Sequence, residues 1–94
     1  MNLPQLRTHI ERLDDRIVGL LNRRLELAQQ IGDLKMQNGD KVYNRQRERQ
    51  LLARLSARLA GPLTNQELRS IYQRILKASR DHQKRVLISR KDYF

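Results

Sequence analysis

Apolar residues recur along the first third of the chain at alternating spacings of four and three. This is the heptad pattern of a helix that pairs with another helix along one side. The positions of this heptad seam are Leu6, Ile10, Leu13, Ile17, Leu20, Arg24, Leu27, Ile31 and Leu34. Asn2 and Pro4 are start signals for a helix, and Gly39 in the stretch QNGD is a stop signal. The pattern therefore predicts a helix over residues 3–38 whose seam is interrupted by Arg24.

A second apolar stripe begins near residue 45 and predicts a shorter helix. Gly61 and Pro62 close this helix, because glycine is favoured just past a helix end and proline cannot continue one. The positions of the second stripe are Glu48, Leu51, Leu52, Leu55 and Leu59.

A third stripe follows a capping box formed by Thr64 and Glu67, and it predicts a helix over residues 65–88. Its positions are Leu68, Ile71, Tyr72, Ile75, Ser79, Gln83 and Val86. No alternating strand pattern competes with these stripes. The sequence therefore predicts an all-α fold, with one long and two shorter helices in a single domain over residues 1–94.

The length of the first helix predicts an assembly. A helix of 36 residues is about 54 Å long, whereas a compact globule of 94 residues is only about 30 Å across. The helix must therefore overhang its own domain and expose its seam, which predicts an intertwined, two-fold helical homodimer. The alternative is a monomer in which the helix kinks near Gly19 or Gly32 and folds back.

The composition of the chain limits the kinds of site and of partner that the protein can have. The chain has no cysteine, its two histidines lie far apart, and its longest apolar run is too short for a membrane span. We therefore expect a cytoplasmic protein without disulfides, metal or cofactor. The net charge of +10 indicates an anionic partner, which could be nucleic acid, an acidic protein or a small polyanion. The few aromatic residues and the scattered arginines argue against nucleic acid.

Polar residues interrupt all three stripes. Arg24 and Lys35 share one face of the first helix, with the small residues Ala28 and Gly32 between them. The other breaks are Arg47 with Glu48 on the second helix and Ser79 with Gln83 on the third. One such break is usually a snorkelling or internally paired side chain. A break in each helix, together with excess positive charge, favours a buried cavity for a small anion.

Four short motifs, in order, resemble the AroQ-class (type II) chorismate mutase family. The motifs are LR-x5-LD from Leu6, R-x-ELA from Arg24, G-x-x-K from Gly32 and N-x-x-RE from Asn44, and Ser79 with Gln83 fits the same pattern. The resemblance covers nearly the whole chain. It implies an intertwined helical dimer with two active sites, each of which borrows one arginine from the other chain.

The resemblance implies the rearrangement of chorismate to prephenate, in which an ether C–O bond breaks while a C–C bond forms. Arg24, Arg47 and Arg7 of the partner subunit would clamp the two substrate carboxylates, and arginine suits this role through its fork of donors. Ser79 is similar to another carboxylate contact in the family.

The remaining implied roles concern charge development and the ring hydroxyl. Lys35 and Gln83 would donate to the ether oxygen, where negative charge grows. Glu48 and the backbone near Asn44 would hold the ring hydroxyl. Many family members carry aspartate at the position of Asn44, and an amide accepts a hydrogen bond less strongly than a carboxylate.

Several alternatives remain open at the level of sequence. Arg47 and Glu48 could be solvated first-turn charges, Asn44 a simple N-cap, and Arg7 a surface partner of Glu11. Ser79 and Gln83 could face solvent. An isochorismate pyruvate lyase would use a similar fold and a similar set of cations, and a basic helical nucleic-acid-binding dimer is the alternative outside the enzymes.

Overall fold

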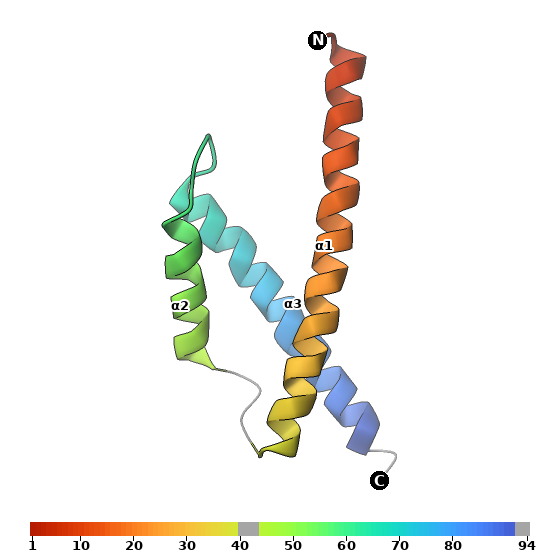
Figure 1. The fold of residues 1–94 in the computed structure, drawn as a ribbon, viewed down its shortest axis with the longest axis vertical. Helices are drawn as coiled ribbons and strands as arrows, with labels where there is room; N and C mark the ends of the chain where they lie inside the picture. Colours follow the sequence, from red (N-terminus) through yellow and green to blue (C-terminus); the bar gives the residue numbers. More distant parts are fainter. Residues whose placement is uncertain (40–43, 92–94) are drawn as a thin grey trace.

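The structure, a computed structural model, describes residues 1–39 and 44–91, with side chains described as far as residue 85. Three helices make up the described part, in which no strand occurs. They are α1 (Leu3–Gln37), α2 (Arg45–Ser56) and α3 (Asn65–Lys91) (Figure 1). The predicted all-α fold with one long and two shorter helices is confirmed. The side chain of Val86, predicted in the third stripe, lies outside the described residues.

Side-chain caps fix the starts of α1 and α3. The Asn2 side chain accepts from the Gln5 backbone N–H while the Gln5 side chain accepts from the Asn2 N–H, each at 3.0 Å. Thr64 and Glu67 form the predicted capping box at 3.0 and 3.1 Å. The backbone and hydroxyl hydrogen bonds from Thr64 lower the pKa of the Glu67 carboxyl. Gly39 stops α1 in the left-handed region, with φ of 75°.

The predicted end of the second helix is wrong. Helix α2 ends at Ser56, before Gly61 and Pro62. Beyond this point the Arg58 N–H donates to Leu55 and the Leu59 N–H donates to Ser56, which is the tighter pairing of a terminating turn. Leu59 stays half-buried, so the apolar stripe continues although the helix does not. The Ser56 hydroxyl bonds the Asn65 side chain at 2.6 Å and ties the end of α2 to the start of α3.

Helix α1 is continuous and projects far beyond the other two helices. Figure 1 shows α3 crossing the second half of α1, with α2 beside the first part of α3. The chain measures 57 × 28 × 16 Å, with a radius of gyration of 16.9 Å, whereas a compact chain of this length would have about 12 Å. Because α1 is continuous from Leu3 to Gln37, the alternative in which this helix kinks near Gly19 or Gly32 and folds back is wrong.

Burial on α3 departs from its predicted stripe at two positions. Leu68, Ser79 and Gln83 are buried as expected, but Ile71 is 51% exposed, and Leu76, which the pattern omitted, is only 7% exposed. At 100° per residue, the buried residues Leu68, Leu76, Ser79 and Gln83 fall within a sector of about 80° on α3, and Ile71 lies outside it. The buried face is therefore a single stripe that is rotated from the predicted one.

Helix α1 packs on α3 mainly with a face beside its heptad seam, although the seam positions Arg24 and Ile31 line a cavity between the helices. The side chains that meet α3 are centred on Leu21, Leu25, Ala28 and Gly32, each one residue after a seam position and therefore about 100° around the helix from the seam. The eight apolar seam positions are all exposed. The helices of the described region are all too polar or too short to cross a membrane.

Candidate active site

A cavity of about 200 Å³ lies among the three helices. It is lined by Arg24, Ala28, Ile31, Lys35, Asn44, Arg47, Glu48, Leu51, Leu76, Ser79, Arg80 and Gln83. Seven of the eight residues that the sequence nominated therefore line one cavity, although they come from three separate segments. The eighth, Arg7, does not line it.

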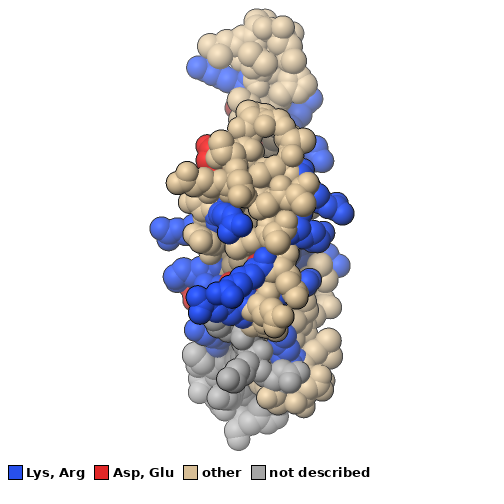
Figure 2. Space-filling view, turned by 90° about the vertical axis from the view of Figure 1, so that its left-hand side faces the viewer, with Lys and Arg blue, Asp and Glu red and all other residues tan. Residues whose placement is uncertain are grey.

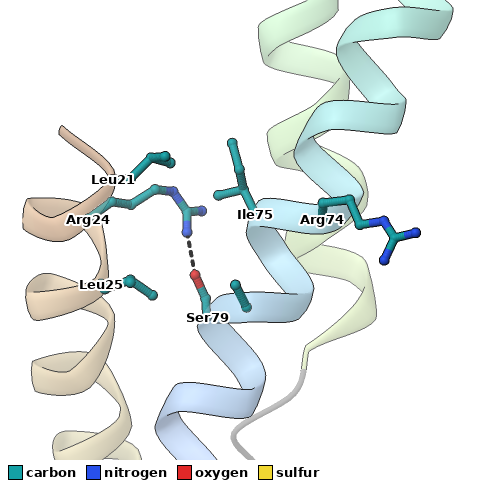
Figure 3. A pocket seen from close by; sticks show the side chains of 7 residues that line it. Leu21, Arg24, Leu25, Arg74, Ile75 and Ser79 are labelled. Atoms are coloured by element: carbon teal, nitrogen blue, oxygen red, sulfur yellow. Dashed lines mark hydrogen bonds between the residues drawn. The ribbon is translucent and has the colours of Figure 1, made fainter. Parts of the chain in front are cut away.

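Arg24 reaches from α1 to α3. Its Nη1 donates to the Ser79 hydroxyl at 2.8 Å, and Figure 3 shows the two side chains pointing toward each other. The same two residues also line a second cavity of about 240 Å³, together with Leu21, Leu25 and Ile75. Arg24 and Ser79 thus stand between an apolar hollow and the polar cavity. Because Ser79 is buried, the solvent-facing alternative for this residue is wrong.

Gln83 is held in place by the backbone of α1. Its side-chain Nε2 donates to the Ala28 carbonyl oxygen at 2.5 Å. Gly32 lies at this close crossing, where an added Cβ would be 3.4 Å from the Gln83 Cγ, at the short edge of van der Waals contact. An amide nitrogen carries two hydrogens, so the anchored group has a second N–H to offer to a ligand. Gln83 is buried, which contradicts the solvent-facing alternative for it as well.

The first turn of α2 supplies Asn44, Arg47 and Glu48. The Asn44 side chain accepts from the Arg47 backbone N–H at 3.0 Å, so it is the N-cap of α2 while it also lines the cavity. Arg47 is exposed and Glu48 is half-buried. The cap fixes where the helix begins and hence the direction in which these first-turn side chains leave the backbone.

Arg80 is a cavity residue that the sequence analysis missed. Its Nη1 donates to both carboxylate oxygens of Glu48, each at 2.6 Å, and joins α3 to α2. The signal was present in the sequence, because residues three apart on a helix are neighbours and Arg80 stands three before Gln83. It was missed because position 80 lies outside the predicted stripe, so an arginine there does not interrupt the apolar pattern.

The cavity carries excess positive charge. Four cations line it, Arg24, Lys35, Arg47 and Arg80, against the single carboxylate of Glu48, so four minus one gives +3. The face of the molecule shown in Figure 2 likewise has many more Lys and Arg than Asp and Glu side chains. Arginine and lysine around a concave, partly apolar pocket favour a small anion with more than one negative group.

Arg7 is exposed near the free end of α1. It lies seventeen residues before Arg24 on a continuous helix, which is a rise of about 25 Å. In the part of the chain that the structure describes, it forms no ion pair with Glu11. A single chain therefore does not bring Arg7 to the cavity.

Curated relatives share the sequence pattern over most of this chain. A bifunctional chorismate mutase/prephenate dehydratase of Aquifex aeolicus is 33% identical over 91 residues, covering 93% of this chain and 25% of that protein. The T-protein of Haemophilus influenzae is 41% identical over 61 residues, covering 63% and 16% respectively. The chain thus spans a quarter or less of the curated relatives it matches.

Solved structures match in fold and in length. A chorismate mutase of Thermus thermophilus has a TM-score of 0.86 at 35% identity, with 88% of this chain and 94% of that chain covered. A chorismate mutase of Helicobacter pylori in complex with prephenate has a TM-score of 0.84 at 35% identity, with 90% and 92% covered. The family model for type II chorismate mutase matches residues 6–84. The chain belongs to the type II chorismate mutase family.

Proposed function

We propose that this chain catalyses the rearrangement of chorismate to prephenate, in the biosynthesis of phenylalanine and tyrosine. The observation that carries the proposal is the cavity itself, in which seven nominated residues from three helical segments surround a space with a net charge of +3. The similar Helicobacter pylori protein was solved with prephenate. A cytoplasmic location stays a prediction from the sequence.

The reaction needs a site that holds a flexible dianion in a compact shape. Arg24 and Arg47 offer planar forks of donors to the substrate carboxylates, and Ser79, already bonded to Arg24 at 2.8 Å, adds a hydroxyl beside them. When the site holds the two ends of the substrate near each other, the substrate loses its conformational entropy on binding. That loss then no longer adds to the activation barrier of the reaction. These contacts orient the substrate and form no covalent bond.

Charge that develops on the ether oxygen needs donors placed in advance. Lys35 supplies a positive charge from α1, and Gln83 supplies the second N–H of its anchored amide. Such donors act most strongly where water is excluded and the donor need not reorient. On the other side of the ring, Glu48 and the backbone near Asn44 accept or orient the hydroxyl. Each of these roles is filled by a side chain or a backbone group of the protein.

The working unit in this proposal is a homodimer. The solvent-accessible surface of the chain is 8044 Å², against roughly 5,700 Å² for a compact monomer of this mass. The excess coincides with the exposed heptad seam, and packing two seams together would bury it. Antiparallel pairing of two α1 helices would also carry Arg7 of the partner subunit toward Arg24, across the gap that one chain cannot span.

The test is to add the protein to chorismate, follow the loss of its absorbance and identify the product. Prephenate supports the proposal. In a parallel assay with isochorismate as the substrate, release of pyruvate would instead identify the lyase activity. Titration with duplex DNA over a range of salt concentrations is the second arm, because DNA binding through phosphates weakens steeply with salt. Salt-sensitive DNA binding without turnover of chorismate would contradict the proposal.

A further inference from the structure

Arg80 is the cation of the cavity to which the site described so far assigns no role toward the substrate. It occupies the turn of α3 between Ser79 and Gln83, and its guanidinium crosses to α2. The Arg80 and Glu48 side chains are 27% and 22% exposed. The pair is therefore much better shielded than the Lys77–Asp81 pair on the same helix, whose side chains are 60% and 48% exposed.

The geometry of the pair fixes the Glu48 carboxylate. One guanidinium nitrogen lies 2.6 Å from each of the two oxygens, so it bridges them symmetrically. Each carboxylate oxygen can accept more than one hydrogen bond, so Glu48 can be held by Arg80 and still accept a ligand hydroxyl. A glutamate has three side-chain torsions, and a partner on another helix restricts them before any ligand arrives.

Charge gives a second reason for the pair. A carboxylate in a pocket for a dianion repels the ligand, and at short range in a shielded site this repulsion is large. Arg80 compensates that charge within hydrogen-bond distance. The cavity can then keep an acceptor for a neutral hydroxyl without losing its attraction for two carboxylates.

We infer that Arg80 is a positioning residue that orients Glu48 and neutralises it, so that Glu48 can accept a hydrogen bond from the ring hydroxyl of the substrate. The inference rests on the proposed function. It assigns selectivity for hydroxyl-bearing cyclic dianions to a pair of residues from α2 and α3, rather than to Glu48 alone.

A double-mutant cycle tests the inference. Arg80→Ala, Glu48→Gln and the double variant are compared with the wild type in kcat and KM for chorismate. A hydrogen bond to a charged group corresponds to about 10- to 100-fold, so we expect Arg80→Ala to lower kcat/KM by about that factor. In the Glu48→Gln background the same change should cost less than about twofold, because the carboxylate on which Arg80 acts has gone.

Controls separate positioning from charge and from folding. Lys77→Ala removes a positive charge that is paired with the Asp81 carboxylate on the exposed face of the same helix. This variant should leave kcat/KM unchanged. Arg80→Lys keeps the charge and should recover part of the loss. Thermal unfolding verifies that each variant is folded, and the dissociation constant for prephenate gives the cycle a second readout when turnover is slow.

Each outcome has one meaning. Equal losses from Arg80→Ala in both backgrounds would overturn the inference, because Arg80 would then contact the substrate itself or act through the general field. An unchanged kcat/KM in Arg80→Ala would overturn it as well. A wild-type protein that does not convert chorismate refutes the proposed function, and with it this role, whereas an active wild type with an additive cycle refutes the role of Arg80 alone.

Discussion

The two halves of α1 share one apolar pattern but lie in different surroundings. Every residue from 3 to 20, the projecting half, is exposed. From Leu21 onward, the crossing half lies against α3, with Gly32 buried and Arg24 and Lys35 half-buried. The heptad seam runs through both halves, so the seam by itself does not indicate where a chain packs on itself.

The difference shows how one helix can serve two contacts. In the projecting half the seam is the only apolar face, and it has no partner among the described residues of its own chain. In the crossing half a second face, turned about 100° from the seam, packs against α3. Arg24 and Lys35 lie between the two faces, which is where a side chain can reach both a cavity and a second chain. In the proposed dimer, the polar break in the seam would therefore mark the place where the contact with α3 meets the contact with the partner subunit.

The largest expected effect concerns the crossing half. Lys35→Ala should lower kcat by about 10²- to 10³-fold, because one preorganised donor to developing charge contributes that much. Lys84→Ala, an exposed lysine on α3, is the matched control and should keep its activity. Steady-state kinetics measure kcat, and circular dichroism verifies that both variants are folded. A Lys35→Ala protein with wild-type kcat would remove Lys35 from the reaction.

Mixed dimers test one residue from each half of α1 in a single experiment. If each site uses Arg24 of one chain and Arg7 of the other, as proposed, Arg7→Ala and Arg24→Ala homodimers should each be nearly inactive, because each would lack one clamp in both sites. A dimer of one chain of each kind has one intact site and one site that lacks both arginines. Co-refolding should therefore restore up to about half of the wild-type activity per mixed dimer. If native mass spectrometry shows exchange without recovery, Arg7 does not act across chains.

Leu13→Asp probes the projecting half. Leu13 is 51% exposed in the single chain, and an exposed substitution on a monomer usually changes the free energy of unfolding by no more than about 0.5 kcal/mol. In a paired seam the new charge would be buried, at a cost of several kcal/mol. We expect loss of the dimer and of activity. Asn22→Asp adds the same charge on the opposite side of α1 and should keep both. Analytical ultracentrifugation distinguishes the variants.

The helix starts and the gathering of site residues could be predicted from sequence, because caps and polar breaks are local signals. Asn2 and Thr64 cap as expected, and the polar breaks at Arg24, Ser79 and Gln83 line one cavity. The end of α2 and the role of Arg80 could not. Both depend on how α2 and α3 meet in space, which periodicity along one helix does not contain.

Gln83→Glu tests the anchored amide by pH. A neutral amide donates at any pH, whereas a glutamic acid must be protonated to donate to the Ala28 carbonyl or to the ether oxygen. The variant should be most active at low pH and should lose activity about tenfold per unit once the carboxyl is ionised. The wild-type rate should not show this loss. Equal pH profiles for the two proteins would mean that Gln83 is not a donor in the reaction.

The smallest expected effects come from replacing the glycine in each half of α1 by alanine. A Cβ at Gly32 would lie 3.4 Å from Gln83 Cγ and 3.6 Å from Cδ, whereas a Cβ at Gly19 would meet nothing within 4 Å. Replacing a mid-helix glycine by alanine favours the helix by about 0.8–1.0 kcal/mol, so Gly19→Ala should raise the unfolding temperature and leave kcat unchanged. Gly32→Ala gains the same helix propensity but displaces the anchored Gln83 by a few tenths of an ångström. A several-fold fall in kcat is then expected, since misplaced donors lose their effect on developing charge. If both alanine variants kept full kcat, the close crossing at Gly32 would matter for packing and not for the position of Gln83.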